Sequence, residues 1–186
     1  LNSGGQLMHL SGHSAAVRAV QVSGDGRHLL SASADGSLAY WDAENGRLKN
    51  RLCGHMGVVY AACFHPDGRR ALSCGADGRV LLWDLAAGRE IGRFDGHRQP
   101  VYALAISPDG NRALSSDAHG TVIHWTVPEG EILHRFPGYL ERGADSDWML
   151  GHIDAAWGVA FVPGSETAIS VSQDQFALLW DLREGK

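Results

Sequence analysis

The stretch VVYAACFHPDGRRALSCGADGRVLLWDL, residues 58–85, decides the fold. Apolar residues recur in it with a period of two, which predicts β-strands. The turn sequences Pro66-Asp67-Gly68 and Asp77-Gly78 interrupt this pattern and are typical of tight hairpins. We therefore predict antiparallel strands that follow one another along the chain.

The same unit occurs four times. Its last five letters, LLWDL at Leu81–Leu85, return at Leu178–Leu182. Each unit has a Gly-His pair and a Trp 28 residues after the His, with the pairs at Gly12-His13, Gly54-His55, Gly96-His97 and Gly151-His152. Three units repeat every 42 residues, and the fourth is delayed by 13. Because one four-stranded meander cannot bury both of its faces alone, neighbouring sheets are expected to stack.

The composition excludes several classes of protein. With 186 residues, of which 44% are hydrophobic and 20% charged, the chain is long enough for a sizeable core and is neither disordered nor membrane-like. The net charge of −5 counts against general nucleic-acid binding. Cys53, Cys63 and Cys74 lack metal-type spacing and are expected to be small buried hydrophobic residues. No targeting sequence identifies the compartment; we favour the cytoplasm, or the periplasm or cell exterior if a leader was removed before Leu1.

A period of 42 residues marked by Gly-His and Trp-Asp resembles the WD40 repeat, the blade unit of β-propellers. The resemblance implies an all-β propeller segment of four four-stranded antiparallel blades, with loop histidines and turn aspartates on one face, called the top face. The expected bounds are 1–10 for the outer strand of a preceding or closing blade, 11–52, 53–94 and 95–136 for blades 1 to 3, 137–150 for a top-face insertion, and 151–186 for blade 4, which lacks its outer strand.

Ser, His and Asp recur together in the units, as in a hydrolase triad. Four nucleophiles would need four substrate pockets and four oxyanion holes, of which the sequence gives no sign. In WD40 proteins, these residues form buried hydrogen-bond chains, so the resemblance implies a structural role. The expected chains are His13–Ser31–Asp35–Trp41, His55–Ser73–Asp77–Trp83, His97–Ser115–His119–Trp125 and His152–Ser170–Asp174–Trp180.

The third unit departs from the pattern. His119 replaces the turn Asp and Thr126 replaces the Asp after the Trp, so the carboxylate that would orient His97 is expected to be missing; Asp117 lies two positions away. One interpretation is a degenerate blade held by its neighbours. The other is a metal-binding or proton-active pair formed by His97 and His119. No further ligand is evident, so we expect neither a metal nor a cofactor.

The resemblance places partner contacts at the fifth residue after each loop His. These positions hold three aromatic residues and one arginine, types that are enriched in interface hot spots: Arg18, Tyr60, Tyr102 and Trp157. We expect them to form an arc around the central channel, the alternative being that the rings only pack between blades. The insertion is interpreted as a partner-binding loop or a tolerated addition, and it contributes Tyr139, Asp145, Asp147 and Trp148.

These observations predict a protein–protein interaction scaffold that binds a protein or peptide, without enzymatic activity, nucleic-acid binding or membrane insertion. The alternatives are the recognition part of a larger enzyme or redox protein, or a small-ligand or metal site at the channel mouth. Three ring arrangements remain open: part of a longer chain with a seven- or eight-bladed ring, two chains that complete one ring, or a true four-bladed ring. Gln6–Leu10 resembles an outer strand and would complete a blade.

Overall fold

The computed structural model describes residues 5, 7–138 and 151–186, which form fifteen β-strands and no helix. Each sheet is an antiparallel meander in which successive strands are neighbours. The first sheet contains β1 (Val17–Val22), β2 (His28–Ser33), β3 (Ser37–Asp42) and β4 (Leu48–Cys53). The second contains β5 (Val59–Phe64), β6 (Arg70–Gly75), β7 (Arg79–Asp84) and β8 (Arg89–Asp95). The third contains β9 (Val101–Ile106), β10 (Arg112–Asp117), β11 (Val122–Thr126) and β12 (Ile132–Phe136). The fourth contains β13 (Ala156–Phe161), β14 (Thr167–Ser172) and β15 (Ala177–Asp181).

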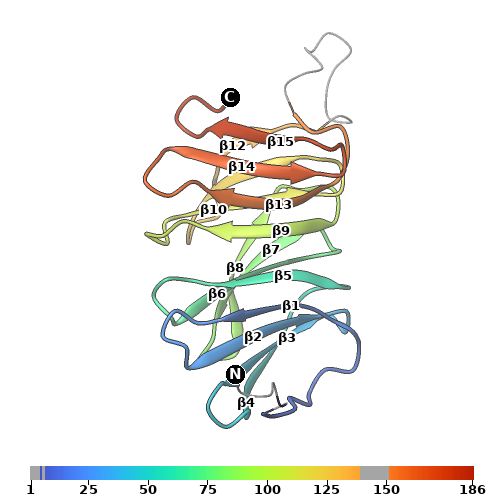
Figure 1. Ribbon diagram of the computed structural model, residues 1–186, viewed down its shortest axis with the longest axis vertical. Coiled ribbons are helices and arrows are strands. Elements are labelled where there is room, and N and C mark those ends of the chain that lie inside the picture. Colours follow the sequence, from blue (N-terminus) through green and yellow to red (C-terminus); the bar gives the residue numbers. More distant parts are fainter. Residues whose placement is uncertain (1–4, 6, 139–150) are drawn as a thin grey trace.

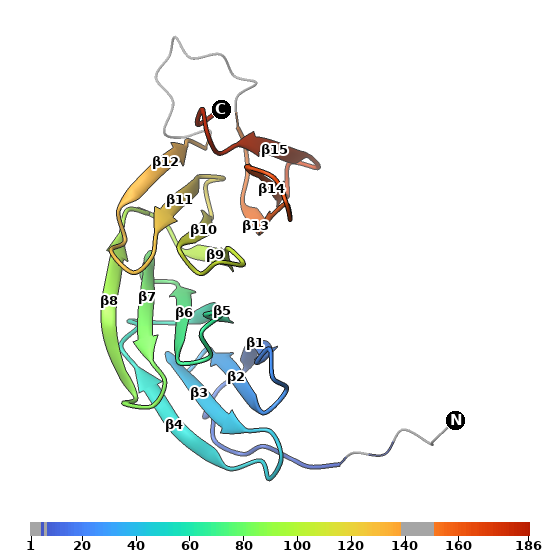
Figure 2. The same cartoon turned by 90° about the vertical axis from the view of Figure 1, so that its left-hand side faces the viewer.

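The four sheets, called blades 1 to 4, stand side by side (Figure 1) and form an open arc (Figure 2). The first strands β1, β5, β9 and β13 line the concave inner side in Figure 2, whereas β4, β8 and β12 lie on the outside. The main contacts between blades join neighbours: β1 and β2 pack on β5, β5 and β6 on β9, and β9 and β10 on β13. The predicted all-β architecture of antiparallel meanders is confirmed. Blades 1 and 4 lie at opposite ends of the arc, so the described residues do not form a closed four-bladed ring.

Each junction between blades is an apolar core. The repeat Trp of the later blade faces the preceding blade: Trp83 packs with Leu30 and Tyr40, and Trp125 packs with Leu72 and Phe94. Trp83 and Trp125 are fully buried. Since large aromatic side chains dominate the energetics of a core, these junctions hold the blades in a rigid arc.

The turn between β5 and β6 shows how the local sequence fixes a hairpin. Asp67 Oδ1 accepts hydrogen bonds from the backbone N–H groups of Arg69 and Arg70, at 2.8 and 3.1 Å. Gly68 adopts a φ of +68°, a left-handed conformation that glycine takes without strain. The turn therefore sets the register in which Phe64 pairs with Ala71.

Leu7–Leu10 form no strand, although an outer strand is predicted over Gln6–Leu10; Gln6 lies outside the described residues. A strand needs a hydrogen-bonded neighbour, and none lies beside this segment in the described part of the chain. The side chains of Met8 and Leu10 instead pack against Gly46 in the turn between β3 and β4, where a Cβ atom would meet both. No helix that is long and apolar enough to cross a membrane occurs among the described residues.

Candidate functional site

A hydrogen-bond chain links the loop His, the β-strand Ser and the Trp in all four blades. The Trp Nε1–H donates to the Ser hydroxyl at 2.7–2.8 Å, and the same hydroxyl lies 2.7–2.8 Å from His Nε2. Each His carries its proton on Nδ1, because a carboxylate accepts there, so Nε2 accepts the Ser O–H while the Ser oxygen accepts from the indole N–H. The four chains are His13–Ser31–Trp41, His55–Ser73–Trp83, His97–Ser115–Trp125 and His152–Ser170–Trp180.

An aspartate completes each chain by accepting from His Nδ1. Asp35 lies 2.9 Å from His13 and Asp174 lies 2.8 Å from His152, while both carboxylate oxygens of Asp77 lie 3.0 Å from His55. Burial alone would raise the pKa of Asp35, but hydrogen bonds from Ser37, the backbone of Ser14 and His13 lower it well below the usual range. The pKa values of Asp77 and Asp174 are also lowered by such bonds. These carboxylates are therefore ionised and fully partnered at neutral pH.

Blade 3 keeps its carboxylate, which corrects the expectation that it is missing. Asp117 Oδ2 lies 2.8 Å from His97 Nδ1, and both side chains are buried. Asp117 Oδ1 accepts from the backbone N–H groups of His119 and Thr121, at 2.9 and 3.0 Å. Asp117 thus takes the role that Asp35 has in blade 1. In the described residues, the side chain of His119 does not join the chain for which it was predicted.

The polar groups of these hydrogen-bond chains are occupied by one another. Both ring nitrogens of His97 are occupied, by Asp117 and Ser115, so the predicted alternative of a His97–His119 pair is not formed. The four serines are buried, and Ser73 and Ser115 have no exposed surface, so a substrate carbonyl cannot reach them. In the described part of the chain, no cluster of three or more His, Cys, Asp or Glu side chains could hold a metal ion.

The four predicted partner-binding residues on the inner strands share a structural feature that the sequence did not indicate. In each innermost strand, the pairing register shifts across the fifth residue after the loop His, as at a β-bulge. Two residues of the inner strand there oppose one residue of the next strand, and a bulge redirects the side chain of the extra residue. The extra residues are Arg18, Tyr60, Tyr102 and Trp157.

Three of these residues form one continuous row. The ring centroids of Tyr60 and Tyr102 are 4.9 Å apart in an edge-to-face contact. Tyr102 and Trp157 stack in parallel, with centroids 4.4 Å apart and an interplanar angle of 3°. Trp157 is nevertheless 54% exposed. In the described residues, no ring contact includes Arg18, which is exposed at the blade 1 end of the arc.

Two further apolar residues of blade 4 lie at the carboxylate of Asp174. The backbone N–H groups of Ile153 and Phe176 both donate to the carboxylate of Asp174, at 3.0 and 2.9 Å, so the two residues are close together on the top face. Ile153 and Phe176 are exposed. Tyr139, Asp145, Asp147 and Trp148, the predicted contributions of the insertion, lie outside the described residues.

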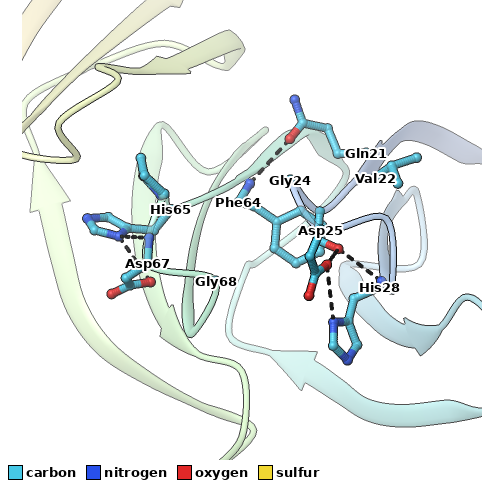
Figure 3. A pocket seen from close by; sticks show the side chains of 11 residues that line it. Gln21, Val22, Gly24, Asp25, His28, Phe64, His65, Asp67 and Gly68 are labelled. Atoms are coloured by element: carbon cyan, nitrogen blue, oxygen red, sulfur yellow. Dashed lines mark hydrogen bonds and ion pairs between the residues drawn. The ribbon is translucent and has the colours of Figure 1, made fainter.

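A polar hollow of about 510 Å³ lies on the opposite face, between the β1–β2 turn and the β5–β6 turn (Figure 3). Figure 3 shows Asp25 beside His28 and Asp67 beside His65. Asp25 accepts from Ser23, and His65 lies 3.0 Å from both the Asp67 carboxylate and the Gly110 carbonyl. The lining residues come from blades 1 and 2, so the hollow lies at the junction between these two blades.

Comparison with known proteins adds two findings. Residues 4–42, 46–84 and 88–126 match the protein family described as "WD domain, G-beta repeat". A stretch of 45 residues is 49% identical to "Eukaryotic translation initiation factor 3 subunit I" from Xenopus tropicalis, and this match covers 24% of the chain and 14% of that protein. The fourth unit lies outside the matched ranges but has the same His152–Ser170–Trp180 chain as the other three.

Proposed function

Because the chain belongs to the WD domain, G-beta repeat family, we propose that it is an interaction scaffold whose top face binds a protein or peptide. The observation that carries this proposal is the row formed by Tyr60, Tyr102 and Trp157. Three bulges in successive inner strands direct these rings into one surface. Rigid aromatic side chains give large contact areas at low entropic cost, which suits them to anchor a partner.

Trp157 is the proposed centre of the site. Tyr102 covers one face of the indole, and the remaining exposed surface is available to a partner side chain. Ile153 and Phe176 would extend the apolar contact, and Arg18 would make polar contacts at the other end of the row. The proposal also includes the four predicted contacts of the insertion, for which the sequence alone is the support: Tyr139, Asp145, Asp147 and Trp148.

The proposed mechanism is rigid display without chemistry. The burial of the serines in the hydrogen-bond chains supports this view, because it removes from solvent the hydroxyl groups that resemble those of a hydrolase triad. The name of the Xenopus relative describes a subunit of a translation initiation factor, which supports a place for this chain in a protein assembly.

The test compares two folded variants. One is Tyr60→Ala/Tyr102→Ala/Trp157→Ala, and the matched control is Ile91→Ala/Leu133→Ala, which removes exposed apolar side chains from outer strands. Proteins captured by wild type from a lysate of the source cells would be purified and their Kd measured by calorimetry. We expect the triple variant to bind at least about 100-fold more weakly and the control to bind normally. Equal binding by the triple variant and wild type would refute the site.

A further inference from the structure

A second hollow, of about 590 Å³, lies at the junction of blades 1 and 2 and shares Gly68, labelled in Figure 3, with the hollow drawn there. We call it the Tyr40 hollow. Blade 1 lines it with Tyr40 of β3 and Lys49 of β4, and blade 2 lines it with the β5–β6 and β7–β8 turns, including Arg69 and Asp84. Its volume lies in the range of small-ligand sites, roughly 300–1,000 Å³.

The hydroxyl of Tyr40 is a donor without a partner in the described part of the chain. Its ring belongs to the core between blades 1 and 2 and is 6% exposed. The hydroxyl is still accessible, because His124 Nε2 is the one fully enclosed side-chain nitrogen or oxygen without a partner among the described residues. Burial, followed by the charges of Asp25 and Asp42, raises the pKa of Tyr40, so the hydroxyl keeps its proton. Since a buried tyrosine hydroxyl normally has a hydrogen-bond partner, this one is available to a ligand.

Lys49 brings a positive charge that is held in place but not neutralised. Its Nζ lies 3.2 Å from His28 Nε2 and 5.4 Å from the centre of the Tyr40 ring. The His28 ring in turn stacks on Tyr40, with centroids 5.1 Å apart. Across residues 7–138 and 151–186, no carboxylate forms an ion pair with Lys49. The ammonium group is therefore positioned by two neutral rings.

Arg69 brings a second such charge from blade 2. Its backbone N–H donates to Asp67 Oδ1 at 2.8 Å, and its carbonyl accepts from the N–H of Leu85 at 3.0 Å, so the main chain is fixed on both sides. The neighbouring Arg70 forms an ion pair with Asp67, at 2.7 Å. The guanidinium of Arg69 has neither an ion pair nor a hydrogen bond within the residues that the structure describes.

The carboxylate in the lining, Asp84, is already used by the fold. Its Oδ1 accepts from the backbone N–H groups of Ala86 and Ala87, at 3.0 and 2.9 Å. Asp42 and Asp181 accept in the same way in the equivalent turns of blades 1 and 4. The side chains of the lining therefore carry two positive charges and one negative charge, and the negative one has a structural role.

The other two junctions do not repeat this set of donors, although the blades are built alike. At the places of Tyr40, Lys49 and Arg69 stand Leu82, Ile91 and Asn111 between blades 2 and 3, and His124, Leu133 and Glu166 between blades 3 and 4. Neighbouring blades thus pack together without a hydroxyl and two cations. These groups have a purpose other than holding the junction.

We propose that the Tyr40 hollow binds a phosphate monoester, carried by a small molecule or by a phosphorylated side chain. Lys49 and Arg69 together match the charge of a monoester near neutral pH, about −1.5 to −2. Arg69 can donate to two phosphate oxygens and the Tyr40 hydroxyl to the third. A carboxylate has two oxygens and one charge, so it would leave one donor and one cation without a partner.

The first test is a titration of the protein followed by NMR of the backbone amides of Gly68, Arg69 and Ala86. The probes are glycerol phosphate and a short phosphoserine peptide, and the controls are the unphosphorylated peptide and the same peptide with glutamate. We expect saturable shifts with at least one phosphate probe. Tighter binding of the peptide would identify a phosphorylated side chain as the ligand, and tighter binding of glycerol phosphate a small molecule. No saturable shift with either probe, or equal binding of the glutamate peptide, would overturn the proposal.

Substitutions assign the binding to the three donors. Lys49→Met and Arg69→Met should each raise the Kd of the better probe about tenfold or more, because each removes a charged donor. Tyr40→Phe should raise it about fivefold and leave the urea midpoint of unfolding unchanged, since the hydroxyl has no partner in the protein. The matched control is Arg27→Met, at the equivalent place in the turn of blade 1, and it should bind normally. Normal binding by Lys49→Met and Arg69→Met, or a Tyr40→Phe variant that loses stability but binds normally, would refute the site.

Discussion

The indole of Trp157 lies parallel to the phenol ring of Tyr102, with centroids 4.4 Å apart, although the residues belong to different blades. Tyr60 continues the contact from a third blade. The rings therefore pack between blades and also present a surface, so the two interpretations of the aromatic arc are compatible. Packing holds each ring in one orientation, which reduces the entropy that binding would cost.

Trp157→Ala should separate binding from stability. The side chain is 54% exposed and its stack with Tyr102 is worth about 0.5–1.5 kcal/mol, so we expect a loss of about 1 kcal/mol in unfolding free energy. Trp180→Ala, which empties a buried site, should cost about 3–5 kcal/mol. Urea unfolding followed by circular dichroism measures both. A loss above 3 kcal/mol in Trp157→Ala would identify the ring as core instead of contact surface.

The Asp117 carboxylate should be essential to the stability of blade 3. Asp117→Ala leaves His97 Nδ1 and the backbone N–H groups of His119 and Thr121 without their acceptor, and we expect a loss of about 2–3 kcal/mol. His119→Ala should change the unfolding free energy by less than about 0.5 kcal/mol. Denaturant unfolding curves of wild type and of the two variants measure the differences in unfolding free energy.

A swap of the carboxylate tests the same relationship. Asp117→Ser/His119→Asp gives blade 3 the residues that blade 1 has at Ser33 and Asp35. Because Asp35 lies 2.9 Å from His13 in that arrangement, the double variant should recover most of the stability that Asp117→Ala loses. If the double variant loses as much unfolding free energy as Asp117→Ala, the backbone geometry of blade 3 differs from that of blade 1 at this turn.

The sequence predicted the features that recur with fixed spacing. It failed in blade 3, where the carboxylate that accepts from the loop His stands at another position of the repeat. The apolar alternation predicts the strands, and the resemblance to the WD40 repeat implies the Ser-centred chains, which the structure shows in every blade. Asp117 was named but not assigned to the chain, because its place two positions before His119 does not show that its carboxylate reaches Nδ1 of His97. The bulges at Tyr60 and Trp157 escaped prediction because apolar alternation does not show which residue of a strand is unpaired.

The three cysteines should differ in reactivity. Burial raises the pKa of the Cys63 thiol to about 12, and burial followed by the nearby Cys63 raises the pKa of Cys74 as well. Since the thiolate is the reactive form, both should resist alkylation in the folded protein, whereas exposed Cys53 should react. Iodoacetamide labelling followed by mass spectrometry should show one modification under native conditions and three in urea. Native labelling of Cys63 would indicate that the junction between blades 2 and 3 opens readily.

His124 lies at the junction of blades 3 and 4 and makes an unusual cross-strand pair. It is buried, and its Nδ1 lies 3.3 Å from Nδ1 of His134 on β12, which is its direct partner across the sheet. Its Nε2 atom is buried without a hydrogen-bond partner in the described residues. A buried N–H without an acceptor costs more than a buried lone pair, so we assign the proton to Nδ1, which donates to His134.

This pair should make the protein sensitive to mild acid. Burial, followed by the positive charge of Arg112 and electrostatic repulsion from His134, lowers the pKa of His124 to about 4, and Glu166 opposes the shift only weakly. The unfolded chain, with a His pKa near 6.5, therefore binds the proton more readily. The stabilisation by neutral His124 is complete above about pH 6.5 and is lost as the pH falls towards 4, by roughly 3 kcal/mol.

His124→Leu, which introduces the residue found at Leu82 in blade 2, should remove this part of the pH dependence. Urea unfolding at pH 7.5 and 4.5, at equal protein concentration, measures the difference between wild type and variant. Equal losses in both proteins would show that other groups, such as the His–Asp chains, account for all of the acid sensitivity.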